Sequence, residues 1–311
     1  MDDELLAVRA AELYYDEGKT QDEIGALLGI SRWKAGRLLT HARESGIVRI
    51  EIVHPLARRL GLERAVRDRF GLTDAVVVPV PETGTDALDR VAQAAADYLT
   101  ALRPVPRTLA VSWGRTLTAV ADKLPHGWAH GVSVVQMNGG VSRSRRPGGA
   151  ASLAIAIAQR AAGEAVLLPS PAILEHLETK RAIEADRTVA RVLEQAASAG
   201  TYLFTAGVCD ASSVHVQNGY LAEQDIDELA HRGAIGDVAG RYIDADGHIV
   251  DPELDSRTVG IGLERLREAS TAIFVTAGRA KHDIARAVVT SGLCTVLVTD
   301  EATARTLLED Q

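Results

Sequence analysis

Apolar residues in the first fifty positions recur three or four apart, in three short stretches that each predict a helix. The stretches are closed by glycines and cover residues 5–17, 20–28 and 32–43. The sequence Thr20-Gln21-Asp22-Glu23 is a capping box at the start of the second stretch, and Ser31 can cap the third. Beyond Gly46, alternating apolar and polar residues predict a short half-buried strand with Val48, Ile50 and Ile52 on one side.

Three short helices, a tight turn before the last and a trailing strand are typical of a winged helix-turn-helix. Basic residues concentrate in its second half, namely Arg32, Lys34, Arg37, Arg43 and Arg49. Contact with a DNA groove and its phosphates requires such a basic helix, although a charged helical face can also be merely solvated. Because the caps, the turn and the basic face coincide, we predict DNA contacts by Thr20, Ser31, Arg32, Trp33, Lys34 and Arg37.

Residues 55–72 form an arginine-rich connection, which Pro55 separates from the predicted strand. Leu62, Val66 and Phe70 fall four apart and make a narrow apolar stripe on a short helix. Two interpretations remain open for this stripe: a seam for docking or oligomerisation, or packing against its own domain.

From residue 73 onward, apolar runs alternate with segments of helical periodicity. The runs are nearly continuous and cover residues 75–80, 108–112, 132–137, 165–168, 202–206, 272–276 and 295–299. Strands buried on both faces have this pattern, which predicts a parallel sheet covered by helices. The fold class is therefore α/β, with a winged helix-turn-helix (1–54), a linker or oligomerisation helix (55–72) and a Rossmann-like, mostly parallel domain (73–311).

Ligands of open parallel sheets bind at the carboxyl ends of the strands, so the segments after the strands are candidates. Trp113-Gly114-Arg115-Thr116 and Ala277-Gly278-Arg279-Ala280-Lys281 each combine glycine with cations and lead into a helix, which favours a phosphate. Asn138-Gly139-Gly140 offers an amide beside a close backbone approach, and residues 233–237 end in the Asp237 carboxylate. Each loop alone has a geometric explanation, but together they favour a small anionic, hydroxylated ligand such as a sugar phosphate.

Charge and cysteine content narrow the class of protein. The 34 Lys and Arg against 42 Asp and Glu give the 311-residue chain a formal net charge of −8, so any nucleic-acid contact must be local. Cys209 and Cys294 stand alone, without the spacing of a zinc site or a disulfide framework. The acidic start does not resemble a signal peptide, and charges interrupt the most apolar stretch, so we predict a cytoplasmic protein.

Asp244-Ala245-Asp246-Gly247 resembles the start of a calcium loop but lacks the other ligands of an EF-hand, so a simple turn is the preferred interpretation. The histidines show no metal-ligand spacing. We therefore predict no metal and no other cofactor.

Seven separated motifs, in order, resemble the SorC family of sugar-binding transcriptional regulators. They lie at residues 20–39, 111–117, 135–140, 168–172, 233–240, 278–281 and 298–301. The resemblance implies an N-terminal helix-turn-helix, an effector-binding domain related to sugar-phosphate isomerases and deaminases, and a tetramer. By motif it implies effector contacts at Ser112, Gly114, Arg115, Thr116, Gln136, Asn138, Gly139, Gly140, Asp237, Gly278 and Lys281. Trp33 and Gly36 depart from the commoner family pattern, so the operator sequence does not follow from the resemblance.

We therefore expect an effector-responsive, DNA-binding transcriptional regulator of carbohydrate or polyol catabolism, and not an enzyme. Its expected partners are operator DNA, a small sugar or sugar phosphate and further copies of the chain, without a membrane. One alternative is a sugar-phosphate isomerase or deaminase, although the spacing supports no acid/base constellation. The other is a DNA-binding scaffold that takes no ligand.

Overall fold

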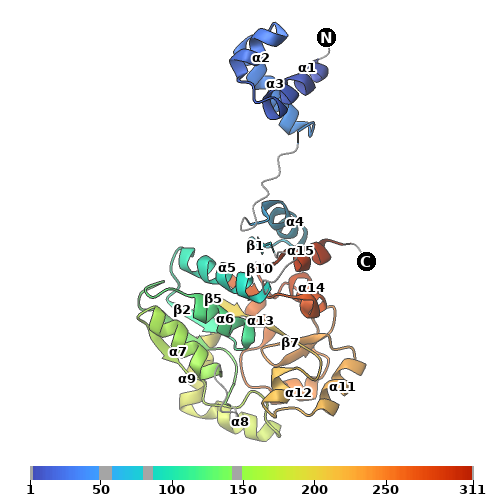
Figure 1. The fold of residues 1–311 in the computed structure, drawn as a ribbon. Helices are drawn as coiled ribbons and strands as arrows, with labels where there is room; N and C mark the ends of the chain where they lie inside the picture. Colours follow the sequence, from blue (N-terminus) through green and yellow to red (C-terminus); the bar gives the residue numbers. More distant parts are fainter. Residues whose placement is uncertain (1–2, 49–57, 80–86, 142–148, 310–311) are drawn as a thin grey trace. The chain divides into compact units, whose positions relative to one another are not determined.

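The computed structural model describes residues 3–48, 58–79, 87–141 and 149–309 (Figure 1). Contacts between residues divide the chain into a first unit, residues 1–54, and a second unit, residues 55–311. The first unit contains α1 (Asp3–Ala11), a π-helical turn η1 (Glu12–Asp16), α2 (Gln21–Leu28) and α3 (Arg32–Glu44). Ile50 and Ile52 of the predicted trailing strand lie outside the described residues.

Both predicted helix caps of the first unit are present. The Thr20 hydroxyl accepts the Glu23 N–H at 3.3 Å, and the Glu23 carboxylate accepts the Thr20 N–H at 2.8 Å. The Ser31 hydroxyl accepts the Lys34 N–H at 3.2 Å, which starts α3. The apolar stripe of α3 then packs against Ile24 and α1 through Ala35, Leu38, Leu39 and Ala42.

A seven-stranded parallel sheet forms the centre of the second unit, in the order β1-β10-β9-β5-β2-β3-β4. Its strands are β1 (Asp74–Val78), β2 (Thr108–Val111), β3 (Ser133–Gln136), β4 (Glu164–Val166), β5 (Thr201–Phe204), β9 (Thr271–Val275) and β10 (Val296–Asp300). All seven predicted runs are strands of this sheet, which confirms the mostly parallel α/β class.

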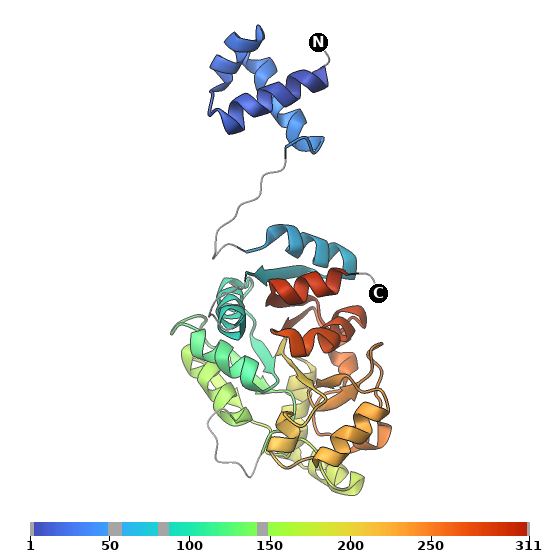
Figure 2. The same ribbon diagram turned by 45° about the vertical axis from the view of Figure 1, so that its right-hand side comes forward.

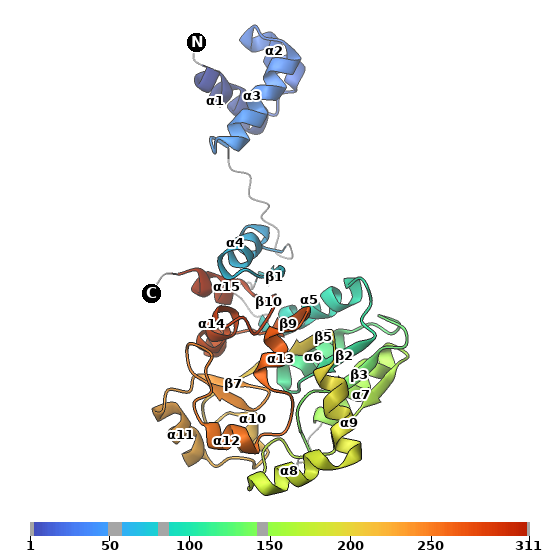
Figure 3. The same cartoon turned by 180° about the vertical axis from the view of Figure 1, so that it is seen from behind.

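Helices cover both faces of the sheet because successive strand residues point to opposite sides. Val76 and Val78 contribute to one core and Ala75 and Val77 to the other. The first face is covered by α5 (Ala87–Ala101), α6 (Arg115–Lys123) and α7 (Ala150–Arg160), in front in Figure 1. The second is covered by α4 (Leu60–Phe70), α9 (Arg187–Ala197), α13 (Leu263–Arg267), α14 (His282–Thr290) and α15 (Glu301–Leu308), and Figure 3 brings α9 and α13 forward.

Most of the described part of the arginine-rich connection forms α4, which lies beside β1 and α15 (Figure 2). Val66 is fully buried in the core of the second unit, and Leu62 and Phe70 pack against that core. All three residues of the stripe therefore pack against their own domain, which is the second of the two interpretations. Residues 55–57 lie outside the described part.

A small antiparallel sheet was not predicted. It consists of β6 (Ala206–Val208), β7 (Gly236–Val238) and β8 (Arg241–Ile243), so Gly236 and Asp237 belong to a strand and not to a loop. Beside it lie α10 (Val214–Gln217), α11 (Glu223–His231) and α12 (Pro252–Arg257), and α8 (Leu177–Ala185) packs against α9 and α12. Three-residue strands carry too little alternation to be recognised in a sequence.

The order of the large sheet reverses beside β2. From β2 the chain proceeds through β3 to β4 at one edge, whereas β5 and β9 lead towards the other. Strand ends diverge at such a switch point, which creates a crevice for ligands in open α/β sheets.

Candidate functional site

A pocket of about 320 Å³ lies at this switch point. We call it the strand-end pocket. Its lining comes from the carboxyl ends of the large sheet and from the small sheet, and includes Ser112 to Thr116, Asn138, Thr205 to Val208, Ser212 to His215, Asp237, Gly240 and Ala277 to Lys281.

Two turns that lead into helices bring cationic and hydroxyl groups to one side of the pocket. Gly114 and Gly278 have φ angles of 143° and 91°, which L side chains rarely adopt, and each precedes a helical segment. The Lys281 ammonium group donates to the hydroxyls of Thr116 at 3.1 Å and Thr205 at 3.3 Å. The two turns therefore meet through the Lys281 side chain.

Lys281 is partly buried, and this position changes its protonation. Burial lowers its pKa to about 8, the Asp237 carboxylate acts in the opposite direction, and the Arg115 guanidinium adds to the lowering. The group is still mostly protonated near neutral pH.

Asp237 and His215 form a buried pair on the other side of the pocket. One Asp237 oxygen, Oδ2, accepts the Gly240 N–H at 2.8 Å and lies 3.3 Å from His215 Nε2. Burial alone would raise the pKa of Asp237, but His215, the Gly240 N–H and Lys281 outweigh it and lower that pKa. The carboxylate is therefore charged at neutral pH.

Three buried polar atoms in the lining have no hydrogen-bond partner among the residues that the structure describes. They are Asp237 Oδ1, His215 Nδ1 and Asn138 Oδ1. Buried polar atoms normally have partners, because leaving one unsatisfied costs about 1–3 kcal/mol. Two of the three atoms are acceptors, so hydroxyl groups are suitable partners.

An aromatic wall completes the pocket. The Trp113 indole N–H donates to the Gly139 carbonyl at 2.8 Å, which fixes the ring. This ring stands edge-on to His215, with 5.8 Å between the ring centroids.

The structure brings eight predicted effector contacts together in the lining: Ser112, Gly114, Arg115, Thr116, Asn138, Asp237, Gly278 and Lys281. Gln136, Gly139 and Gly140 are not part of that lining. Gln136 is buried and its Oε1 accepts the Leu168 N–H at 2.7 Å. Side chains at Gly139 and Gly140 would overlap the Pro171 carbonyl and the Ala150 methyl, so both glycines have a packing role.

Sequence reasoning missed several lining residues. Thr205 comes one residue after β5, where the rule that selected the other loops should have found it. His215 lies in α10 and reaches the pocket only because the small sheet folds back over the strand ends. No spacing in the sequence signals that contact.

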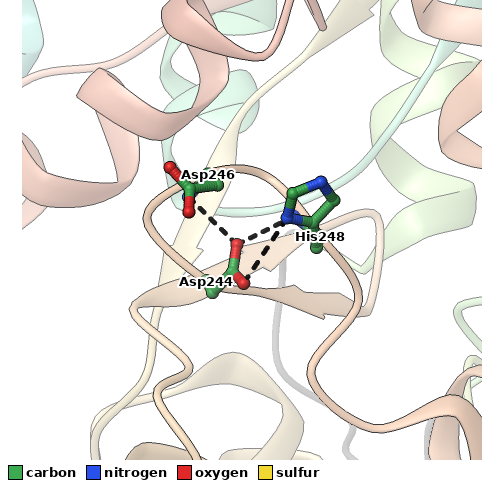
Figure 4. A group of neighbouring side chains, drawn as sticks. All are labelled: Asp244, Asp246 and His248. Atoms are coloured by element: carbon green, nitrogen blue, oxygen red, sulfur yellow. Dashed lines mark hydrogen bonds and ion pairs between the residues drawn. The ribbon is translucent and has the colours of Figure 1, made fainter.

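Asp244, Asp246 and His248 lie together beside β8 (Figure 4), and their ligand atoms are within 4.8 Å of one another. Asp244 Oδ1 accepts the N–H groups of Asp246 at 3.0 Å and His248 at 2.9 Å. These bonds make the segment a turn, as the sequence indicated, and Asp246 and His248 are exposed.

The predicted DNA-binding residues gather at the start of α2 and along α3. Thr20 and Ser31 are caps, so their hydroxyls are already used within the first unit. Arg32 and Arg37 are exposed, and Trp33 is 83% exposed, the most among the large hydrophobic residues described. The surface of α3 therefore combines positive charge with an unpacked indole.

The described helices include none that is long and apolar enough to cross a membrane.

A strand-end pocket on a parallel sheet, in one chain with a three-helix unit that presents a basic helix, is the arrangement of a ligand-responsive transcriptional regulator. Residues 54–309 match the family model described as "Putative sugar-binding domain". The chain belongs to this family, the SorC family of sugar-binding transcriptional regulators.

Relatives and solved structures agree with this assignment. A deoxyribonucleoside regulator of Bacillus subtilis is 31% identical over 307 residues, 98% of this chain and 97% of the relative. An erythritol catabolism regulatory protein of Brucella abortus is 28% identical, with 98% and 97% covered. The full-length sorbitol operon regulator SorC of Klebsiella pneumoniae has a similar structure, with a TM-score of 0.75 and 28% identity over 99% of this chain and 100% of that one. These proteins are regulators, which confirms the prediction of a regulator over that of an enzyme.

Proposed function

We propose that this protein couples a small phosphorylated sugar or polyol, bound in the strand-end pocket, to operator DNA bound by α3. The observation that carries the proposal is the pocket's polarity. A lysine and two glycine turns face one side, and buried polar atoms without partners face the other.

The phosphate would lie at the Gly114 and Gly278 turns. Backbone N–H groups at the start of α6, the Lys281 ammonium and the Thr116 hydroxyl all suit a dianion. Arg115 and Arg279 are exposed at the mouth and add positive charge.

The sugar hydroxyls would lie at Asp237, Asn138 and His215. Their unpartnered buried atoms would gain hydrogen bonds, and the Trp113 ring offers an apolar wall for C–H groups. The names of the relatives support a sugar or polyol as the hydroxylated part of the ligand, since they refer to deoxyribonucleosides, erythritol and sorbitol.

To test the ligand, sorbitol, erythritol and deoxyribose and their phosphate monoesters are titrated by calorimetry. Lys281→Ala should weaken binding of the best phosphate monoester about ten- to a hundredfold, the equivalent of one charge-assisted contact of about 1.5–3 kcal/mol. Lys123→Ala is the control, because Lys123 lies at the end of α6 away from the Gly114 turn and pairs with Asp89. Equal binding by Lys281→Ala, or tighter wild-type binding of the unphosphorylated compound, would refute the phosphate site.

The first unit would place Arg32, Trp33, Lys34 and Arg37 in the major groove. Arg37→Ala should cost about 1–3 kcal/mol if Arg37 reads a base, or reduce the salt slope of binding by about one if it meets phosphate. The duplex for this test comes from selection on random-sequence DNA. Arg9→Ala is the control, since Arg9 lies on α1 and pairs with Glu12; an Arg37→Ala protein that behaves like it contradicts this placement.

We further propose that the protein is a cytoplasmic homo-oligomer, a tetramer by family resemblance. One helix-turn-helix reads one half-site, whereas an oligomer gains affinity through effective concentration. Light scattering at micromolar concentration should give a mass above one chain, with or without DNA, and a monomer in both states would refute the oligomer.

A further inference from the structure

One wall of the strand-end pocket is held in place from behind by a buried carboxylate. The backbone N–H of Gly278, in the turn that leads to Lys281, donates to Asp300 Oδ2 at 2.9 Å. We call this turn the Gly278 turn. Asp300 is 2% exposed and also caps α15, since its Oδ1 accepts the Thr303 N–H at 2.9 Å. The Thr303 hydroxyl donates to Oδ2 as well, at 2.8 Å.

The next residue, Glu301, reaches in a different direction. Its Oε2 accepts a hydrogen bond from Arg59 Nε at 2.7 Å, and its Oε1 accepts one from Arg305 at 2.6 Å. Burial alone would raise the pKa of Glu301, but the two arginines lower it. Glu301 and Arg59 are mostly buried, with side chains 19% and 24% exposed.

Arg59 stands at the start of the second unit, just before α4. The backbone N–H of Arg59 donates to the carbonyl of Val77, in the edge strand β1, at 2.8 Å. The boundary between the two units falls a few residues earlier, after His54. A change at the Gly278 turn can therefore reach Arg59, near this boundary, through Asp300 and Glu301, which are adjacent at the start of α15.

We infer that Asp300 is a positioning residue of the strand-end pocket, and that Glu301 transmits the occupancy of this pocket to Arg59. The inference rests on the proposed function. A phosphate that binds the Gly278 turn moves or stiffens its backbone, and the Asp300 carboxylate accepts hydrogen bonds both from the Gly278 N–H and from Thr303 in the first turn of α15. Because Glu301 follows directly, the same shift changes its contact with Arg59.

The test measures coupling: the ratio of the dissociation constants for the best phosphate monoester, without and with the selected DNA duplex, on the full chain. Effector and DNA affinities are reciprocally linked, and such couplings are typically about 5–150-fold. Arg59→Ala should bring the ratio close to one while leaving the DNA-free affinity for the monoester unchanged. Glu301→Gln should do the same, and the double variant should lose nothing further.

Two matched controls separate this contact from general disturbance. Arg305→Ala removes the other partner of the same carboxylate, and Arg58→Ala removes a neighbouring arginine that pairs with Glu63 instead. Both should retain wild-type coupling. Wild-type coupling in Arg59→Ala, or equal loss in Arg305→Ala, overturns the inference; absence of coupling in the wild type overturns the proposed function and the inference with it.

Asp300 is tested in the absence of DNA. Asp300→Asn should weaken monoester binding, whereas Thr303→Val, which removes the other hydrogen bond to Oδ2, should not. Monoester binding by Asp300→Asn equal to that of the wild type overturns the positioning role. If Asp300→Asn does not fold, the Arg59 and Glu301 variants still decide the transmission.

Discussion

Lys281 is the cation whose side chain joins the two turns of the strand-end pocket. Its ammonium group is held by two threonine hydroxyls, between the attraction of Asp237 and the repulsion of Arg115. A lysine in this position is a cation at neutral pH but titrates closer to it than an ordinary lysine.

Binding of a phosphate monoester should therefore depend on pH. The monoester is already a dianion above pH 7, since its second pKa is about 6. The lowered pKa of Lys281, about 8, means that binding to the free protein requires uptake of a proton above that pH. Calorimetry should show an affinity that begins to fall between pH 7 and 8 and falls steeply above pH 8.

The matched variant for this pH prediction is Lys281→Met, whose affinity should be low and independent of pH over the same range. A wild-type profile that stays flat up to pH 9.5, or a variant profile that falls in parallel with it, would assign the binding charge to another group.

The exposed Trp33 indole gives a second prediction at the scale of single residues, which concerns its contact with DNA. Its indole is 83% exposed on α3 and stands between Arg32 and Lys34 in the sequence. In the major groove the apolar feature that an indole can contact is the thymine methyl group. Replacing the contacted thymine by uracil should cost the wild type about 0.8 kcal/mol, the value of one buried methylene.

Trp33→Ala should bind the thymine and uracil duplexes equally, as measured by fluorescence anisotropy with uracil introduced one position at a time. If no single uracil weakens wild-type binding, Trp33 does not contact a thymine methyl group.

At the scale of elements, strands of the large sheet were predictable because burial on both faces gives continuous apolar runs. Tyr202 to Phe204 and Ala272 to Val275 are such runs. The caps Thr20 and Ser31 were also readable, since a cap depends on residues only three apart. The small sheet was not, because its strands are three residues long and their partners are distant in sequence.

Residues of the candidate site could be predicted from the sequence where they directly follow the strands of the large sheet. The Gly114 and Gly278 turns lie in the pocket lining, whereas Gly139 and Gly140 do not, and a Cβ atom would overlap the Pro171 carbonyl at Gly139 and the Ala150 methyl at Gly140. A sequence does not distinguish a glycine that admits a ligand from one that admits a neighbouring backbone.

Gly139→Ala tests this distinction. The new methyl group would overlap the Pro171 carbonyl, so the variant should lose about 1–3 kcal/mol of unfolding free energy, as overpacked sites do. Urea denaturation measures the loss through the transition midpoint. Wild-type stability combined with lost effector binding would instead return Gly139 to the ligand site.

At the scale of the whole molecule, the two units divide charge and chemistry between them. The chain carries a net charge of −8, yet α3 presents Arg32 and Arg37 to solvent, so we expect attraction to DNA at α3 of the first unit. The pocket with Lys281 lies in the second unit. Regulation then requires that occupancy of one unit change the affinity of the other.

The most direct test of that claim is the DNA affinity of the full chain, measured with and without a saturating phosphate monoester, for wild type and Lys281→Ala. We predict that the monoester changes wild-type DNA affinity at least about fivefold, the lower end of typical allosteric couplings. Lys281→Ala should bind DNA as the wild type does without monoester, and should show no change at a monoester concentration that saturates only the wild type. A monoester that binds but leaves wild-type DNA affinity unchanged, or changes both proteins equally, would contradict the account.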